Sequence, residues 1–105
     1  MPLERSVKNF FLLPLAESYF KARQPEKARR ICEAVYTAIS EDLAYLFSFP
    51  PKELKNMDMN LQEAIMTMQQ LQKLTEGYNQ EDLARKAKAV YDQYYQLYVD
   101  KVYTP

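Results

Sequence analysis

A chain of 105 residues is long enough to bury a core as one domain, and 48% hydrophobic with 27% charged residues is typical of a folded globular protein. Its 14 basic and 14 acidic side chains cancel, so it lacks the positive field that attracts nucleic acid or an anionic membrane. One glycine is too few for an all-β fold, and a single cysteine, Cys32, without any histidine excludes a Cys/His zinc site and an intramolecular disulfide. We therefore expect an all-α protein without metal, cofactor or nucleic-acid partner.

The first helix is predicted over residues 10–22. Apolar residues recur there at three- and four-residue steps, which is the spacing of one helix face. Because proline is tolerated only in the first turn of a helix, Pro14 predicts that the regular part begins near Leu13. The longest uncharged apolar run here, residues 9–16, is far shorter than the roughly 20 residues of a membrane span. We therefore expect no transmembrane helix.

The second helix is predicted from Pro25 to Phe47. Pro25 suits the first helical position, and Glu26 suits the positive end of the helix dipole. The short connection around Gln24 makes the two helices antiparallel neighbours, so residues 10–47 form a first hairpin. The inner face of the second helix is broad and apolar, and it consists of Ala28, Ile31, Cys32, Val35, Tyr36, Ile39, Leu43 and Leu46.

Residues 48–59 are predicted to form a surface loop. They combine two prolines and two lysines with alternating polar residues, a composition typical of irregular connections. This proline loop separates the first hairpin from a second one, which is predicted over residues 60–101.

The second hairpin is expected to begin at Asn60, whose spacing to Glu63 is that of an N-cap with a reciprocal acidic partner. Gly77 is expected to end its first helix in the left-handed conformation, and Asn79 is expected to cap its second helix. Shifting the sequence by 56 residues aligns three pairs of identical residues: Leu15 with Leu71, Gln24 with Gln80, and Ala28 with Ala84. These matches indicate either a degenerate internal repeat or chance.

Tyrosines crowd the last helix, and we expect three of them to close the core, namely Tyr91, Tyr94 and Tyr98. Tyr95 is expected to be exposed, and a ligand platform is the alternative because tyrosine offers a flat ring and a hydroxyl together. Met66 is expected to be half exposed, and its flexible thioether suits an adaptable surface. Since tyrosine is enriched at interfaces, the predicted partner surface consists of Tyr95, Phe49, Pro50 and Pro51.

No catalytic constellation is present in the sequence. One glycine cannot build a phosphate-binding loop, no histidine is available as a base, and the serines stand in no nucleophile motif. Four-residue steps from Glu26 to Arg30 and from Glu81 to Arg85 favour salt-bridged solvent faces over phosphate sites. We therefore predict that the chain is not an enzyme, although four carboxylates are the candidates for acid–base chemistry: Glu17, Glu33, Glu41 and Asp42.

The first hairpin combines a leucine, a small residue, an aromatic pair and a residue for close helix contact, which are Leu15, Ala16, Tyr19 with Phe20, and Ala28. In these positions it resembles a tetratricopeptide repeat. Two positions depart from that repeat: Arg23 takes the left-handed turn position that is often glycine, and Pro25 replaces the usual aromatic residue at the turn. The periodicity and the short connections predict two antiparallel hairpins, with four helices in a single domain over residues 1–105, and the resemblance implies that this fold is tetratricopeptide-like.

Four longer segments carry a second resemblance: Phe11–Ala22, Glu26–Ala28, Glu41–Pro51 and Tyr91–Tyr98. They are similar to the C-terminal soluble tail of a family of large bacterial multi-pass membrane proteins of unknown function, which resemble protein O-mannosyltransferases. The resemblance implies that a membrane-embedded N-terminal part carries out glycosyl transfer and that the tail lies outside the cytoplasm. It places no catalytic position of the family in this segment.

These resemblances predict a non-catalytic accessory or protein-interaction domain. It would be the C-terminal extramembrane part of a membrane glycosyltransferase-like protein, an excised piece on the periplasmic face. Its partner would be another protein or the membrane domain of the parent. The alternative is a free-standing cytoplasmic helical adaptor or regulator of the same fold.

Overall fold

The computed structural model describes the backbone of residues 2–103 and the side chains of residues 11–103. The described residues contain no strand, so the prediction of an all-α protein is confirmed. The described residues form five α-helices, one more than the four that the sequence predicts. The elements are α1 (Pro2–Lys21), α2 (Pro25–Leu46), α3 (Pro51–Asn56), α4 (Asp58–Gly77), α5 (Glu81–Tyr98) and the π-helical turn η1 (Val99–Tyr103).

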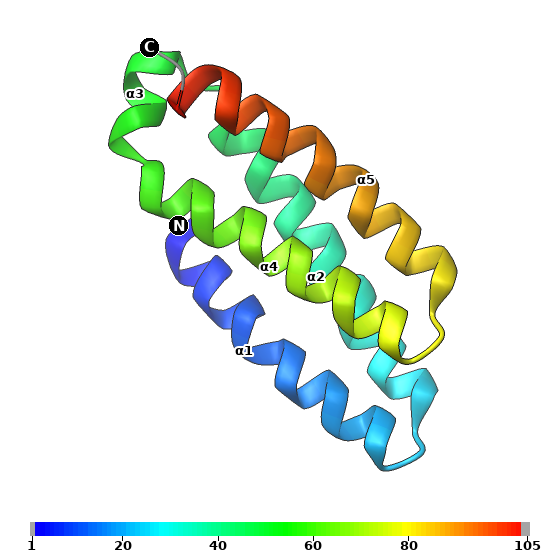
Figure 1. Cartoon of the computed structure of the whole chain (residues 1–105). Coiled ribbons are helices and arrows are strands. Elements are labelled where there is room, and N and C mark those ends of the chain that lie inside the picture. Colours follow the sequence, from blue (N-terminus) through cyan, green and yellow to red (C-terminus); the bar gives the residue numbers. More distant parts are fainter. Residues whose placement is uncertain (1, 104–105) are drawn as a thin grey trace.

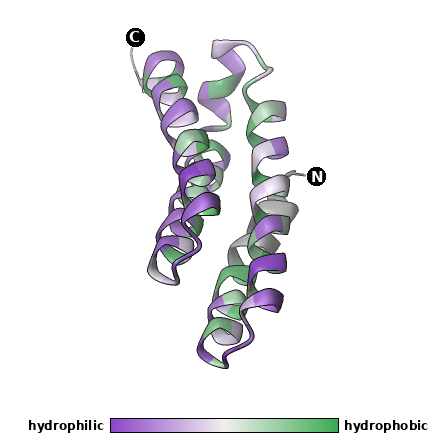
Figure 2. Ribbon diagram, turned by 90° about the vertical axis from the view of Figure 1, so that its right-hand side faces the viewer, coloured by the Kyte–Doolittle hydropathy of each residue, from purple (hydrophilic) through white to green (hydrophobic). Residues whose placement is uncertain are grey.

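The long helices form two hairpins, α1 with α2 and α4 with α5, which pack against each other (Figure 1). Helix α4 is the central element, because it contacts α1 and α2 of the first hairpin as well as α5 of its own. Seen from the side, the hairpins form two layers with both connecting turns at the same end (Figure 2). The short helix α3 crosses between the layers at the other end, where it meets η1.

A continuous apolar core lies between the layers. It includes Ala28 and Cys32 on the inner face of α2, as the sequence predicts. Burial raises the pKa of the Cys32 thiol to about 11, so the thiol stays protonated at neutral pH and acts as a small apolar group. Tyr98 is buried, and Tyr91 and Tyr94 pack against the core at its edge, in agreement with their predicted roles.

The two hairpin turns have the same backbone geometry. Arg23 and Asn79, which are 56 residues apart, both adopt the left-handed conformation, with φ of 61° and 63°. The residue after each turn residue donates its amide to a carbonyl five positions back, and such a bond satisfies an acceptor at a helix end. These bonds are Gln24 to Tyr19 at 2.9 Å and Gln80 to Thr75 at 2.8 Å.

Helix α1 begins at Pro2, so the prediction that regular helix starts near Leu13 is wrong. Pro14 lies inside the helix on an exposed position. A proline there removes one backbone hydrogen bond, and its ring crowds the preceding turn. Because Pro14 is exposed, the disturbed turn faces solvent, and the neighbouring Leu13 and Ala16 remain buried in the core.

The prediction of an irregular loop over residues 48–59 is wrong as well. Pro51 is the first residue of α3, a position that suits proline because its missing amide hydrogen would have no helical partner. The carbonyl of Pro50 accepts from the amides of Glu53 and Leu54, at 2.9 and 3.0 Å. Leu54 is fully buried, and this apolar anchor holds α3 against the core.

Three predicted helix ends in the second hairpin also differ. Helix α4 begins at Asp58, so Asn60 lies inside it and is not an N-cap. Gly77 is the last residue of α4 with no positive φ, and Asn79 provides the left-handed residue instead of a cap, because asparagine tolerates that conformation. Gln80 stands at the N-cap of α5 without a side-chain capping bond.

Candidate functional site

Met66 lies on the exposed face of α4, beside several hollows of the described structure. Its side chain is 55% exposed, which confirms the expected half exposure. Met66 lines each of three neighbouring hollows, one towards α1, one towards α5 and one at the start of α4. We call the three hollows together the Met66 surface.

The hollow between α1 and α4 has a volume of about 560 Å³. Leu13, Pro14 and Leu74 provide its apolar part, whereas Glu17 and Lys73 place one charge of each sign at its edge. Glu17 is partly buried, and its carboxylate accepts a hydrogen bond from the Tyr78 hydroxyl at 3.3 Å. The hollow therefore offers apolar contact with balanced charge.

The hollow between α4 and α5 has a volume of about 300 Å³ and is lined by tyrosines. Gln62 donates one hydrogen bond to the Tyr98 hydroxyl oxygen at 3.0 Å, and that hydroxyl donates to Asp58. Burial and the hydrogen bond to Asp58 raise the pKa of Tyr98, so its hydroxyl stays protonated. Four tyrosines contribute to this hollow, namely Tyr91, Tyr95, Tyr98 and Tyr103.

The third hollow, of about 340 Å³, lies at the start of α4 between Met59 and Met66. Met59 is 82% exposed, so it is not a core filler, whereas Met68 on the opposite face is fully buried. Two unbranched thioethers at a seven-residue spacing thus share one helix face. Such side chains adapt to the shape of a bound partner.

The four residues of the predicted partner surface do not all line one hollow. Tyr95 is 48% exposed and lies in the tyrosine-lined hollow, 5.6 Å from the Tyr91 ring. Phe49 is partly buried and packs edge-on against Tyr45 at 5.3 Å, and the prolines at positions 50 and 51 begin α3. Phe49, Pro50 and Pro51 line none of the three hollows, so only Tyr95 belongs to the Met66 surface.

The remaining acidic candidates are not brought together. Asp42 is buried on α2, whereas Glu33 and Glu41 lie on exposed positions of the same helix. Glu17 faces the second hairpin through its bond to Tyr78. Among the described residues, no group of three or more acidic or sulfur-bearing side chains is placed to hold a metal ion.

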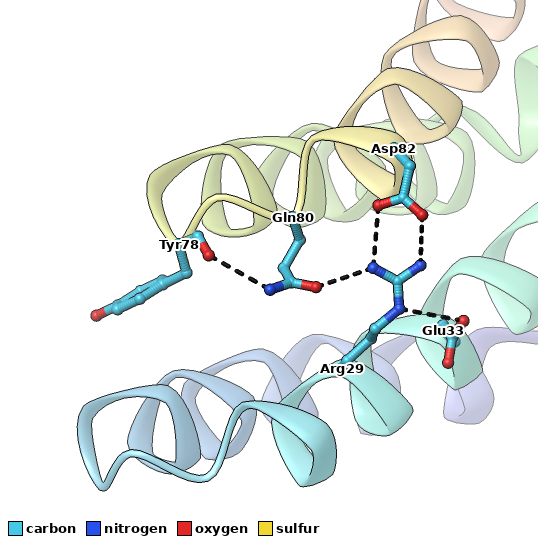
Figure 3. A network of polar contacts seen from close by, with 5 residues as sticks. All are labelled: Arg29, Glu33, Tyr78, Gln80 and Asp82. Carbon is cyan, nitrogen blue, oxygen red and sulfur yellow. Dashed lines mark hydrogen bonds and ion pairs between the residues drawn. The ribbon is translucent and has the colours of Figure 1, made fainter.

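Arg29 joins the two hairpins at their turn end (Figure 3). Its guanidinium donates to both carboxylate oxygens of Asp82, at 2.7 and 3.0 Å, and to the Gln80 side chain at 2.8 Å. Glu33 lies 3.5 Å from the same group. The hydrogen bond from Arg29 lowers the pKa of Asp82 to about 2. The sequence spacing missed this contact, because it indicates only pairs within one helix.

The ion pairs predicted between Glu26 and Arg30 and between Glu81 and Arg85 are not the ones that form. Within the helices, the described pairs are Arg29 with Glu33 and Lys88 with Asp92. Both side chains of the Lys88–Asp92 pair are solvent-exposed, so this pair contributes little to stability.

No family model, curated protein or solved structure matches this chain. Within the described part of the chain, no helix has the length and apolar character needed to cross a membrane.

Proposed function

We propose that the chain is a non-catalytic protein-interaction domain and that a partner segment binds along the Met66 surface. One observation carries the proposal: a single half-exposed methionine lines all three hollows around the central helix. An exposed apolar side chain surrounded by concave surface is typical of a site for another protein.

The chemistry of the surface defines the kind of partner segment. Apolar anchors would enter the hollows beside Met59 and Met66, while the amides of Gln62 and Gln69 and the hydroxyl of Tyr95 hydrogen-bond at the rim. The nearby charges have both signs, so a strongly charged ligand is not favoured. An amphipathic helix or an extended apolar peptide fits this description.

We also propose that the two hairpins are tetratricopeptide-like. Ala28, the expected site of close helix contact, is fully buried, and Arg23 adopts the left-handed conformation of the turn position. The packing of α4 on both helices of the preceding hairpin supports the same proposal, because stacked helical repeats bury a continuous core in this way.

The larger setting follows from the resemblance of the segments in α1, α2 and α5 to a membrane-protein tail. We propose that the domain is the extramembrane part of a glycosyltransferase-like membrane protein on the periplasmic face, and that its partner is another protein or the parent's membrane domain. A free-standing cytoplasmic adaptor is the alternative. Reading the genomic frame upstream of Met1 separates them: continuous coding sequence with apolar stretches of about 20 residues supports the tail.

The binding proposal is tested by selecting peptides from a random library against the full chain. We expect Met66→Glu to weaken binding of a selected peptide by at least about tenfold, because removal of an interface anchor costs more than about 1 kcal/mol. Tyr95→Ser should weaken it too. Tyr45→Ser is the matched control, because Tyr45 is 53% exposed but lines none of the hollows. Equal loss in both tyrosine variants would contradict the proposal.

The non-catalytic assignment has its own test. We expect calorimetry with sugar nucleotides to show no saturable heat and the isolated domain to transfer no sugar. Saturable binding of a nucleotide sugar would overturn this part of the proposal.

A further inference from the structure

The surface by which the second hairpin packs on the first has an equivalent surface on the first hairpin, and this equivalent surface is exposed. The equivalent turn residues Arg23 and Asn79 fix an offset of 56 residues between the hairpins. Each residue by which the second hairpin contacts the first therefore has an equivalent 56 positions earlier in the chain. These equivalent residues mark the surface by which the first hairpin would pack against a further helical hairpin.

One face of α4, continuing into the turn, packs on the first hairpin. The Tyr78 ring stacks on Phe20 with centroids 4.6 Å apart, and Leu74 lines the hollow that it shares with Leu13. Helical periodicity puts Leu71 and Thr67 on the same face, and both are fully buried.

The equivalent face of the first hairpin is exposed over residues 11–22, where the side chains are described. Phe11 corresponds to Thr67 and is 67% exposed, while Leu15 corresponds to the fully buried Leu71 and is 45% exposed. The equivalents of Leu74 and Tyr78 are smaller residues, Ser18 and Ala22, and both are exposed. A partner on this face would therefore meet two large apolar side chains, and it would have to fill the space left by two small ones.

The polar part of the interface is repeated as well. Arg29 of the first hairpin donates to Gln80 and Asp82 of the second. The equivalents of these two acceptors are Gln24 and Glu26, which keep the amide and the carboxylate and lie exposed. The first hairpin thus presents the acceptors for an arginine that no described residue supplies there.

We propose that this amino-terminal face, formed by Phe11, Leu15, Gln24 and Glu26, docks on a helical hairpin of a partner protein. That hairpin would carry an apolar face and an arginine near the start of its second helix, as α2 carries Arg29. Charge complementarity with Glu26 and the internal example of the same contact define this occupant. The proposal concerns a face other than the Met66 surface, so it stands or falls independently.

A second copy of this chain does not meet these requirements. Leu13 and Phe20 of the first hairpin face the second hairpin, and their equivalents on the second hairpin are the polar residues Gln69 and Glu76. Self-stacking in the same geometry would therefore bury the Glu76 carboxylate in the place of an apolar ring, which is costly.

The proposal is tested with a chain in which residues 11–66 occur twice in tandem. The joint brings Phe11 into the place of its equivalent Thr67, so the helical register is preserved, and the added hairpin supplies both the apolar face and Arg29. We expect one cooperative urea transition, with a higher midpoint and an m value about one half larger than that of the parent, since m scales with the surface exposed on unfolding.

The control is the same duplicated chain with Leu15→Glu and Glu26→Lys in the second copy only, at positions that are exposed in the parent. This chain should show two transitions, because its added hairpin cannot dock. Two transitions in the unsubstituted duplication, or failure of that chain to fold, would overturn the proposal, since the docked face is its only new interface.

Sedimentation of the parent chain over a wide concentration range distinguishes the occupants. A monomer at every concentration is expected. Concentration-dependent association that Glu26→Arg abolishes would overturn the proposal in favour of a second copy.

Discussion

The two hairpins share a turn but differ in what they do with the same helix face. Arg23 and Asn79 adopt the same left-handed conformation, and matching backbone hydrogen bonds surround each of them. Leu71 on α4 is fully buried, whereas its equivalent Leu15 on α1 is 45% exposed. The backbone of the unit is thus repeated, while the environment of each face depends on whether another hairpin covers it.

The covered face of the first hairpin contributes to stability, whereas the exposed faces of both hairpins are available for binding. The second hairpin covers the apolar face of the first, and its own outer side combines polar residues such as Glu76 with the tyrosine-lined hollow. The exposed large apolar side chains include Met59 and Met66 on α4, and Phe11 and Leu15 on α1. These are the two regions from which we infer binding.

The largest expected effect comes from Ala28→Arg. Ala28 is fully buried in α2, where a larger charged side chain would both overpack the core and bury an unpaired charge. We expect a loss of about 4 kcal/mol or more, which would unfold most of the chain, as measured by circular dichroism in urea. Ala34→Arg at an exposed position of the same helix is the control. Unchanged melting of the Ala28 variant would contradict the hairpin packing.

The comparison of the hairpins predicts that the same substitution lowers the free energy of unfolding by different amounts at two equivalent positions. Leu71→Ala should lower the free energy of unfolding by about 3 kcal/mol, because it opens a cavity in the core. Leu15→Ala should lower it by less than about 1 kcal/mol, because much of this side chain is already in contact with water. Urea denaturation of both variants measures the difference, and similar losses would show that the two faces are not in different environments.

A smaller effect is expected at the turns. Arg23→Gly should raise the free energy of unfolding by about 0.5 to 1 kcal/mol, because glycine adopts the left-handed conformation without a steric penalty. Asn79→Gly should change it less, since asparagine already tolerates this conformation. Thermal denaturation of the two variants checks the order. A destabilised Arg23→Gly variant would mean that the arginine side chain stabilises the turn.

The ion pair between the hairpins should give the smallest effect and a distinct pH dependence. The pKa of Asp82 falls from its ordinary value of 3.8 to about 2 in the folded state, so the contribution of the pair is present above about pH 4. It is lost as the pH falls towards 2 and the carboxylate takes up a proton. The melting temperature of Asp82→Asn should therefore lie below that of the parent at neutral pH and approach it in acid.

The control for this prediction is Asp92→Asn, which removes an acid from an ion pair within α5 only. A difference between Asp82→Asn and the parent that stays constant from neutral pH to pH 2 would contradict the role of the Arg29 pair.

Helical periodicity and the shortness of two connections were sufficient to predict both hairpins. Pro25 begins α2 as expected, and Ala28 and Cys32 lie in the core. The errors arose where tertiary contacts outweigh local rules. Pro14 is accommodated inside α1 because the helix is anchored on both sides of it, and α3 forms because Leu54 reaches the core.

The candidate site was harder to predict from the sequence than the fold was. The exposure of Tyr95 and Met66 follows from the helical pattern and is confirmed. That both residues line one hollow depends on how α4 packs beside α5, which periodicity does not specify. The contact of Arg29 with Asp82, which are 53 residues apart in the sequence, cannot be predicted by rules that consider only neighbours on a single helix.

The most direct test of the binding assignment is a chemical-shift map of the full chain with a selected peptide. We expect the largest changes at Met59, Met66, Gln69 and Tyr95, which line the hollows of the Met66 surface. Changes centred instead on Tyr45 and Phe49 at the end of α2, with none around Met66, would contradict it.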